Sequence, residues 1–165
     1  VDIPLNFIRY DGEDGKSSIP VCPECLAEAS YIRQSWHLKW VNNCAKHKCK
    51  LIHHCPECNS PINYIENESI THCGCGFELL SASSHPAQED DVKFSQYLMS
   101  EKSPSKNILF DNTSISERFS ALLWYQTRYS SYEKFESNEI VHFFSKWPDN
   151  FFHELDQLSE NAEMK

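Results

Sequence analysis

Closely paired cysteines constrain the fold of this chain more than any other feature. Seven of its eight cysteines and one histidine form four pairs, with one or two residues between partners. The pairs are Cys22 and Cys25, Cys44 and His47, Cys55 and Cys58, and Cys73 and Cys75. Eight soft ligands are the number that two tetrahedral zinc ions require. The sequence therefore predicts two structural zinc ions.

A disulfide framework is the competing interpretation of so many cysteines. Disulfides are typical of secreted proteins, but the sequence shows no signal peptide. It also lacks an apolar run of the roughly 18 residues that would indicate a membrane helix. We therefore expect a cytoplasmic chain whose cysteines bind metal, and a fragment of a longer protein, since it starts at Val1. Cys49 is left over and is expected to be a small buried residue.

Composition divides the chain into a cysteine-rich part and an aromatic-rich part. We expect a lead-in over residues 1–20, a double zinc-finger domain over 21–80, a linker over 81–88 and a helical subdomain over 89–165. The cysteine-rich part has few aliphatic residues, so bound metal would supply much of its folding free energy. The predicted fold class is α+β, with two consecutive small zinc-ribbon or knuckle modules followed by a mainly α-helical subdomain.

Local patterns predict the elements of each part. Residues 61–65 alternate between apolar and polar, which predicts a half-buried strand. Ser114 and Glu117 have the spacing of a capping box, which marks the start of a helix. Helical periodicity predicts helices beginning near residues 89, 114, 137 and 148. Four aromatic residues exceed what one helix face can bury, and they either complete a helical core or form an interface: Trp124, Tyr125, Tyr129 and Tyr132.

The four pairs can be grouped into two sites in two ways. Sequential pairing gives the first two pairs one ion and the last two pairs the other. A cross-braced arrangement joins the first pair with the third and the second with the fourth. Seven residues separate His47 from Cys55, more than cross-braced domains of the ubiquitin-ligase kind usually leave, so sequential pairing is favoured. Four other histidines are candidate substitute ligands but are expected to be surface or packing residues: His37, His53, His54 and His72.

Catalysis is not expected from this chain. A complete set of four ligands leaves no position on the ion for water or substrate. The sequence offers no supported Ser-His-Asp order, no phosphate-binding glycine loop and no H-E-x-x-H motif. We therefore predict no catalytic residues and no cofactor other than the two zinc ions.

The charge of the chain argues against general nucleic-acid binding. The formal net charge is −9, and metal-bound thiolates would lower it to about −12. Phosphate contacts need Lys and Arg, which are outnumbered here. However, residues 29–56 contain no Asp or Glu, and five cations lie within them: Arg33, Lys39, Lys46, Lys48 and Lys50. These cations either offset the nearby thiolates or form a local patch that contacts phosphate.

The motifs of the cysteine-rich part resemble those of a known family. From Ile19 the chain reads IPVCPECLAEASYIRQSWHL, then CAKHKCKLIHHCPEC, and it closes on CGCGFEL. This stretch resembles the zinc-finger core of the TniQ family, which includes the TnsD target selectors of bacterial transposons. The likeness includes Glu28, Tyr31, Trp36 and the exit at Leu79. The later EIVHFFSKWPDNFF is similar to a segment of short TniQ proteins, including those of CRISPR-associated transposons.

The resemblance implies both a ligand assignment and a function. It implies one zinc site from the first two pairs and a second from the last two. It also implies a role in transposon target-site selection, linking transposition proteins such as a transposase regulator to target DNA or to an RNA-guided CRISPR complex. The alternative is a direct DNA-binding zinc-finger or helix-turn-helix module of a transposition regulator. We expect no membrane partner, and homodimerisation stays open.

Overall fold

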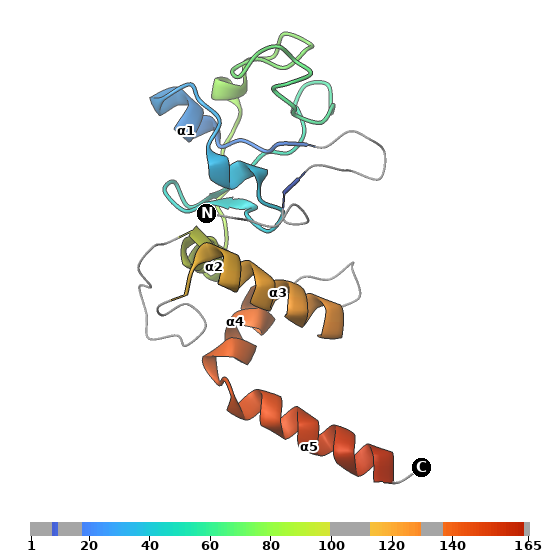
Figure 1. Ribbon diagram of the computed structural model, residues 1–165. Helices are drawn as coiled ribbons and strands as arrows, with labels where there is room; N and C mark the ends of the chain where they lie inside the picture. The colour runs from blue at the N-terminus through green and yellow to red at the C-terminus, as the bar shows by residue number, and fades with distance from the viewer. Residues whose placement is uncertain (1–7, 10–17, 100–112, 130–136, 164–165) are drawn as a thin grey trace. The chain divides into compact units, whose positions relative to one another are not determined.

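The computed structural model describes residues 8–9, 18–99, 113–129 and 137–163 (Figure 1). The chain divides into two compact units, Val1–Met99 and Ser100–Lys165. This division falls later in the chain than the linker expected over residues 81–88. None of the described helices combines the length and the apolar character that a membrane-spanning helix needs.

The first unit combines short helices with a small sheet, in agreement with the predicted α+β class. Its two strands are antiparallel, with Asn43 opposite Lys50 and Cys44 opposite Cys49. Its elements, in chain order, are α1 (Pro23–Glu28), η2 (Gln34–His37), β1 (Asn43–Cys44), β2 (Cys49–Lys50), η3 (Leu79–Ser81) and α2 (Glu89–Met99) (Figure 1).

Backbone pairing and a few large apolar side chains hold the first unit together. The N–H of Val21 donates to the carbonyl of Ile52 at 3.0 Å, and the N–H of Ile52 donates back at 2.9 Å. Leu26, Trp36 and Leu79 are almost completely buried, and α1 contacts η3. The chain before the first knuckle is thereby fixed to the segment between the two cysteine groups.

The segment expected to be a linker pairs with β2. The N–H of Lys50 donates to the carbonyl of His85 at 2.8 Å, and the N–H of Ala87 donates to the carbonyl of Lys48 at 3.0 Å. Helix α2 follows directly and contacts β1, and the side chain of Gln96 donates to the carbonyl of Ala45 at 3.5 Å. The helix predicted from residue 89 therefore groups with the first unit.

The prediction of a strand over residues 61–65 is wrong. Pro61 forms an isolated bridge with His54, and a turn follows. The side-chain Oδ1 of Asn63 accepts the N–H of Ile65 at 3.1 Å, which bends the backbone where the strand would continue. As a result Ile62 and Asn63, although adjacent, are both buried, whereas Ile65 is exposed.

The second unit contains three described helices: α3 (Ile115–Tyr129), α4 (Ser137–Ser145) and α5 (Asp149–Glu163). The capping box is confirmed, since the N–H of Ser114 donates to Glu117 Oε2 at 2.7 Å and the N–H of Glu117 donates to Ser114 Oγ at 3.2 Å. Helix α5 begins directly after Pro148, close to the start expected near residue 148.

Aromatic side chains from all three helices pack against one another in the second unit. The ring of Trp124 lies 6.2 Å from that of Phe143 and 5.7 Å from that of Phe151, and the ring of Tyr125 lies 5.9 Å from that of Phe144. Tyr129 also contacts Phe143. Three of the four aromatic residues singled out from the sequence thus join the helices together. Tyr132 lies outside the described residues.

Candidate metal centres

The eight predicted metal ligands come together as two groups of four. Within each group all donor atoms, cysteine Sγ or imidazole nitrogen, lie within 4.8 Å of one another. Site 1 consists of Cys22, Cys25, Cys44 and His47; site 2 consists of Cys55, Cys58, Cys73 and Cys75. This is the sequential grouping, and each site could hold one metal ion.

A helix start and the β1–β2 hairpin build site 1. Cys22 is the N-cap of α1, and its Sγ accepts the N–H of Cys25 at 3.4 Å. Cys44 lies in β1, and its Sγ accepts the N–H of His47 at 3.4 Å. Both pairs are therefore closed by the same backbone-to-sulfur hydrogen bond. The Nδ1 of His47 lies 3.2 Å from Cys25 Sγ and 3.4 Å from Cys22 Sγ.

Three of the four ligand pairs are followed by a residue in the left-handed region. These residues stand directly after the second ligand: Lys48 (φ 53°), Asn59 (φ 57°) and Gly76 (φ 91°). A left-handed residue reverses the chain after the knuckle, and glycine and asparagine reach this conformation at low cost. The pair Cys22 and Cys25 is the exception, because Cys25 itself lies within α1 and the helix continues to Glu28.

The donor spacing of both sites fits a tetrahedral zinc ion. With Zn–S bonds of about 2.3 Å, two sulfurs on one tetrahedral ion lie about 3.8 Å apart. The Sγ atoms of Cys25 and Cys44 are 3.5 Å apart in site 1. In site 2 the separations are 3.7 Å between Cys55 and Cys75 and 3.6 Å between Cys58 and Cys73. Three thiolates with one imidazole, or four thiolates, are donor sets that zinc commonly takes.

The two sites differ in their exposure to solvent. The three cysteines of site 1 are buried, whereas Cys58 and Cys75 of site 2 are exposed. Hydrogen bonds from Ser60 lower the pKa of Cys58 to about 6, and in site 1 the hydrogen bond with Cys22 lowers the pKa of Cys44 to about 4. Each site therefore contains one thiol with a lowered pKa, and metal binding requires the other thiols to lose their protons as well.

Glu28 supports site 1 from the end of α1. Its Oε1 lies 3.0 Å from His47 Nε2, so the ring nitrogen that faces away from the site is hydrogen-bonded to a carboxylate. This contact orients a histidine ligand and fixes which nitrogen binds the ion. Sequence reasoning placed Glu28 in the family motif without giving it this role. The sequence held a signal for this role, because Glu28 is the acidic residue directly before residues 29–56, which contain no Asp or Glu.

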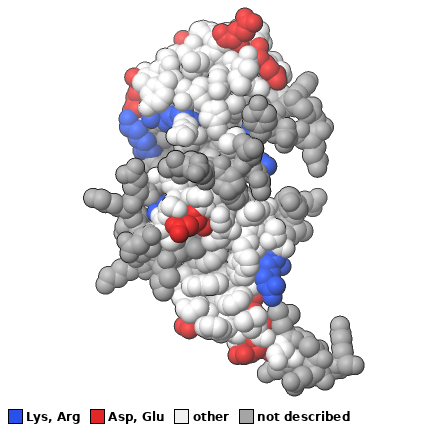
Figure 2. All heavy atoms as spheres, in the orientation of Figure 1, with Lys and Arg blue, Asp and Glu red and all other residues white. Residues whose placement is uncertain are grey.

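The five predicted cations do not form one uniform patch. Lys46 Nζ pairs with Glu28 Oε2, and Arg33 lies 4.0 Å from the same oxygen. Burial lowers the pKa of Arg33, but the hydrogen bond and charge of Cys25, together with the charges of Tyr31 and Cys44, raise it above its ordinary value, and the guanidinium lies beside this site 1 sulfur. Lys39, Lys48 and Lys50 are exposed, and no carboxylate of the described residues lies within 4.0 Å of them. On the face in Figure 2, Lys and Arg gather at one edge of the first unit, close to Asp and Glu.

The four additional histidines are not part of either group of donors in the described chain. His37 packs edge-on against Tyr64, with ring centres 5.9 Å apart. Burial lowers the pKa of His53 to about 4, which keeps this ring neutral. His54 and His72 are exposed. All four agree with the expectation that they are surface or packing residues.

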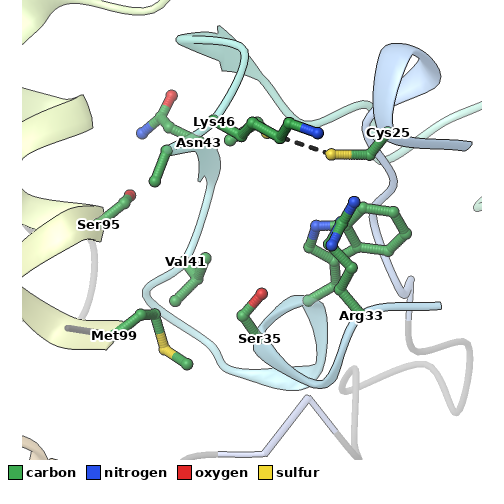
Figure 3. A pocket seen from close by; sticks show the side chains of 11 residues that line it. Cys25, Arg33, Ser35, Val41, Asn43, Lys46, Ser95 and Met99 are labelled. Carbon is green, nitrogen blue, oxygen red and sulfur yellow. Dashed lines mark hydrogen bonds between the residues drawn. The ribbon is translucent and has the colours of Figure 1, made fainter. Parts of the chain in front are cut away.

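A pocket of about 150 Å³ lies beside site 1 in the first unit. Figure 3 shows Arg33 and Cys25 on one side of it and Ser95 and Met99 of α2 on the other. Trp36 and Val41 also line it. The pocket therefore lies between part of α2 and the wall of the metal centre and offers mainly apolar contacts.

A model of the TniQ family matches residues 11–51. A comparison with curated proteins gives no match. The matched segment contains all four residues of site 1 and ends before Cys55, the first residue of site 2. The TniQ resemblance seen in the sequence motifs is therefore confirmed, over the segment that builds site 1.

Proposed function

We propose that this chain is a zinc-binding adaptor that acts in transposon target-site selection. The observation that carries the proposal is the TniQ match over residues 11–51, which coincides with a complete donor set for one metal ion. The adaptor would bind transposition proteins such as a transposase regulator and connect them, in the cytoplasm, to target DNA or to an RNA-guided complex. Homodimerisation is compatible with this role.

The metal has a structural role in this proposal. Each site offers four protein donors, so a tetrahedral ion would have no open position for a substrate or a reactive water. Structural zinc contributes on the order of 10–16 kcal/mol per site to the folding of finger peptides near neutral pH. In the first unit, that free energy would hold the knuckles and the short strands in place. The chain would act by binding rather than by catalysis.

Metal content and partner binding test the proposal together. The purified chain is expected to hold two equivalents of zinc, with one equivalent lost in Cys44→Ser and the other in Cys73→Ser. The zinc-loaded chain is expected to be retained on immobilised transposition proteins. Fewer than two equivalents would contradict the metal assignment. No retention with both ions bound would contradict the adaptor role.

Direct DNA binding is the second candidate function. The observation in its favour is the exposure of Lys39, Lys48 and Lys50, which have no carboxylate partner among the described residues. Arg33 and Lys46 are less available, because both are close to Glu28. Three unpaired cations predict weak, salt-dependent contact with phosphate.

The salt dependence of duplex DNA binding distinguishes this second function. Replacing Lys39, Lys48 and Lys50 by Ala should reduce the slope of log affinity against log salt by roughly 0.9 for each lost phosphate contact. Lys93→Ala is the matched control, because Lys93 is paired with Glu89 at 2.9 Å on α2. An equal slope in the triple variant and the control would rule out direct binding through these lysines.

A further inference from the structure

Cys49 lies at the edge of site 1, although it is not one of the four donors. It begins β2 and is directly opposite Cys44 in β1. Side chains of directly opposed residues lie on the same face of a sheet, so both sulfurs point toward the site. The Sγ of Cys49 lies 3.5 Å from the Sγ of Cys22, and the residue is 2% exposed.

The chemistry of this fifth sulfur differs from that of the ligands. The four donors of site 1 complete a tetrahedral set, and Cys49 is outside the group whose donor atoms lie within 4.8 Å of one another. A thiol that binds no metal ion offers a weak S–H donor. The S–H group of Cys49 can therefore donate a hydrogen bond, while a metal-bound thiolate at Cys22 can accept one.

Site 1 needs such donors because its charge is buried. Three thiolates and one zinc ion carry a net charge of −1, and Cys22 and Cys25 are at most 1% exposed. A buried negative charge is costly unless hydrogen bonds stabilise it. The Sγ of Cys22 accepts the N–H of Cys25 at 3.4 Å, and Cys49 is placed to supply a second donor to the same atom.

We propose that Cys49 is a positioning residue of site 1, donating its S–H to the Cys22 sulfur, and that it thereby strengthens metal binding and protects this sulfur from electrophiles. The inference rests on the proposed zinc ion at site 1. It gives a role to the one cysteine that the pairing pattern leaves unused. It also explains why a cysteine, rather than an aliphatic residue, fits the first position of β2.

Two replacements of Cys49 separate hydrogen bonding from packing. Cys49→Ser keeps a donor, and Cys49→Val fills the space without one. The first measurement on the full zinc-loaded chain is the metal affinity of site 1, by competition with a chelator. The second is the rate at which iodoacetamide alkylates Cys22, located by peptide mass spectrometry. Cys49→Val should lower the affinity of site 1 about tenfold and speed alkylation of Cys22, whereas Cys49→Ser should stay near wild type.

The outcomes distinguish this inference from the proposed function. A wild-type chain without zinc at site 1 would overturn both. If the wild type binds zinc and Cys49→Val matches it in both measurements, only the role of Cys49 is overturned. The same conclusion follows if Cys49→Ser changes as much as Cys49→Val. Alkylation of Cys73, a buried ligand of site 2, should be equal in all three proteins.

Discussion

The contact between Glu28 and His47 allows a sharp test of how site 1 is supported. Glu28 Oε1 lies 3.0 Å from His47 Nε2, and both groups remain partly open to solvent, at 42% and 13% side-chain exposure. Loss of a carboxylate that orients a histidine ligand typically lowers metal affinity 10- to 100-fold. Because solvent screens this contact, we expect Glu28→Ala to show a loss near the lower limit, about tenfold.

The assay is an optical titration with Co²⁺, because site 1, with three sulfurs and one nitrogen, absorbs differently from site 2, with four sulfurs. Glu28→Gln should lose less affinity than Glu28→Ala, since the amide oxygen can still accept the Nε2–H. Glu24→Ala is the matched control, because Glu24 is an exposed acidic residue of the same helix. Site 2 is an internal control within the same molecule. Equal site 1 affinities in Glu28→Ala and Glu24→Ala would refute the reasoning.

Three further predictions concern the second site, a knuckle turn and a helix start. A chelator should remove metal from site 2 before site 1, because two site 2 sulfurs are exposed and those of site 1 are buried. Co²⁺ absorption spectra in which the four-sulfur signal of site 2 disappears last would contradict this prediction. Gly76→Ala should lower the free energy of unfolding, measured in denaturant, by roughly 1–2 kcal/mol. Gly76 has φ 91° and an added Cβ would meet no neighbouring atom, so the cost comes from the backbone conformation alone. The Asn59→Gly variant, which places glycine in another left-handed position, should not lose stability. Hydrogen bonds from Ser114 hold the pKa of Glu117 below its ordinary value, so the cap should be complete above about pH 4.5 and be lost as pH falls through the lowered pKa. An NMR titration of the Ser114 amide measures this pH dependence, which Glu117→Gln should remove. An unchanged titration curve in Glu117→Gln would disprove the prediction.

The sequence was most informative where ligand spacing decides geometry. A short spacing lets a tight turn direct both members of a pair at one ion, and the seven residues between His47 and Cys55, together with the TniQ resemblance, favoured the sequential grouping before any coordinates. The capping box at Ser114 was equally local and was confirmed. In both cases a few neighbouring residues determine the structure.

Long-range pairing was much harder to infer. The segment near His85 and Pro86 looks like a linker because it is rich in small residues, yet its backbone pairs with β2. The alternating pattern at residues 61–65 suggested a strand, but the hydrogen bond from the N–H of Ile65 to Asn63 ends it. Such outcomes depend on partners distant in sequence or on a single side chain that competes for the backbone. Periodicity contains neither kind of information.

The pairing of β2 with residues 85–87 has a practical consequence for any shortened form of this protein. Truncation after residue 80, at the end of the cysteine-rich motif, would leave all eight ligands in place but remove the partner of Lys48 and Lys50. The uncovered edge of β2 would then present unpaired N–H and C=O groups, which can form backbone hydrogen bonds with other chains and cause aggregation. A form that ends after α2, at Met99, retains this cover together with the helix that lies against β1.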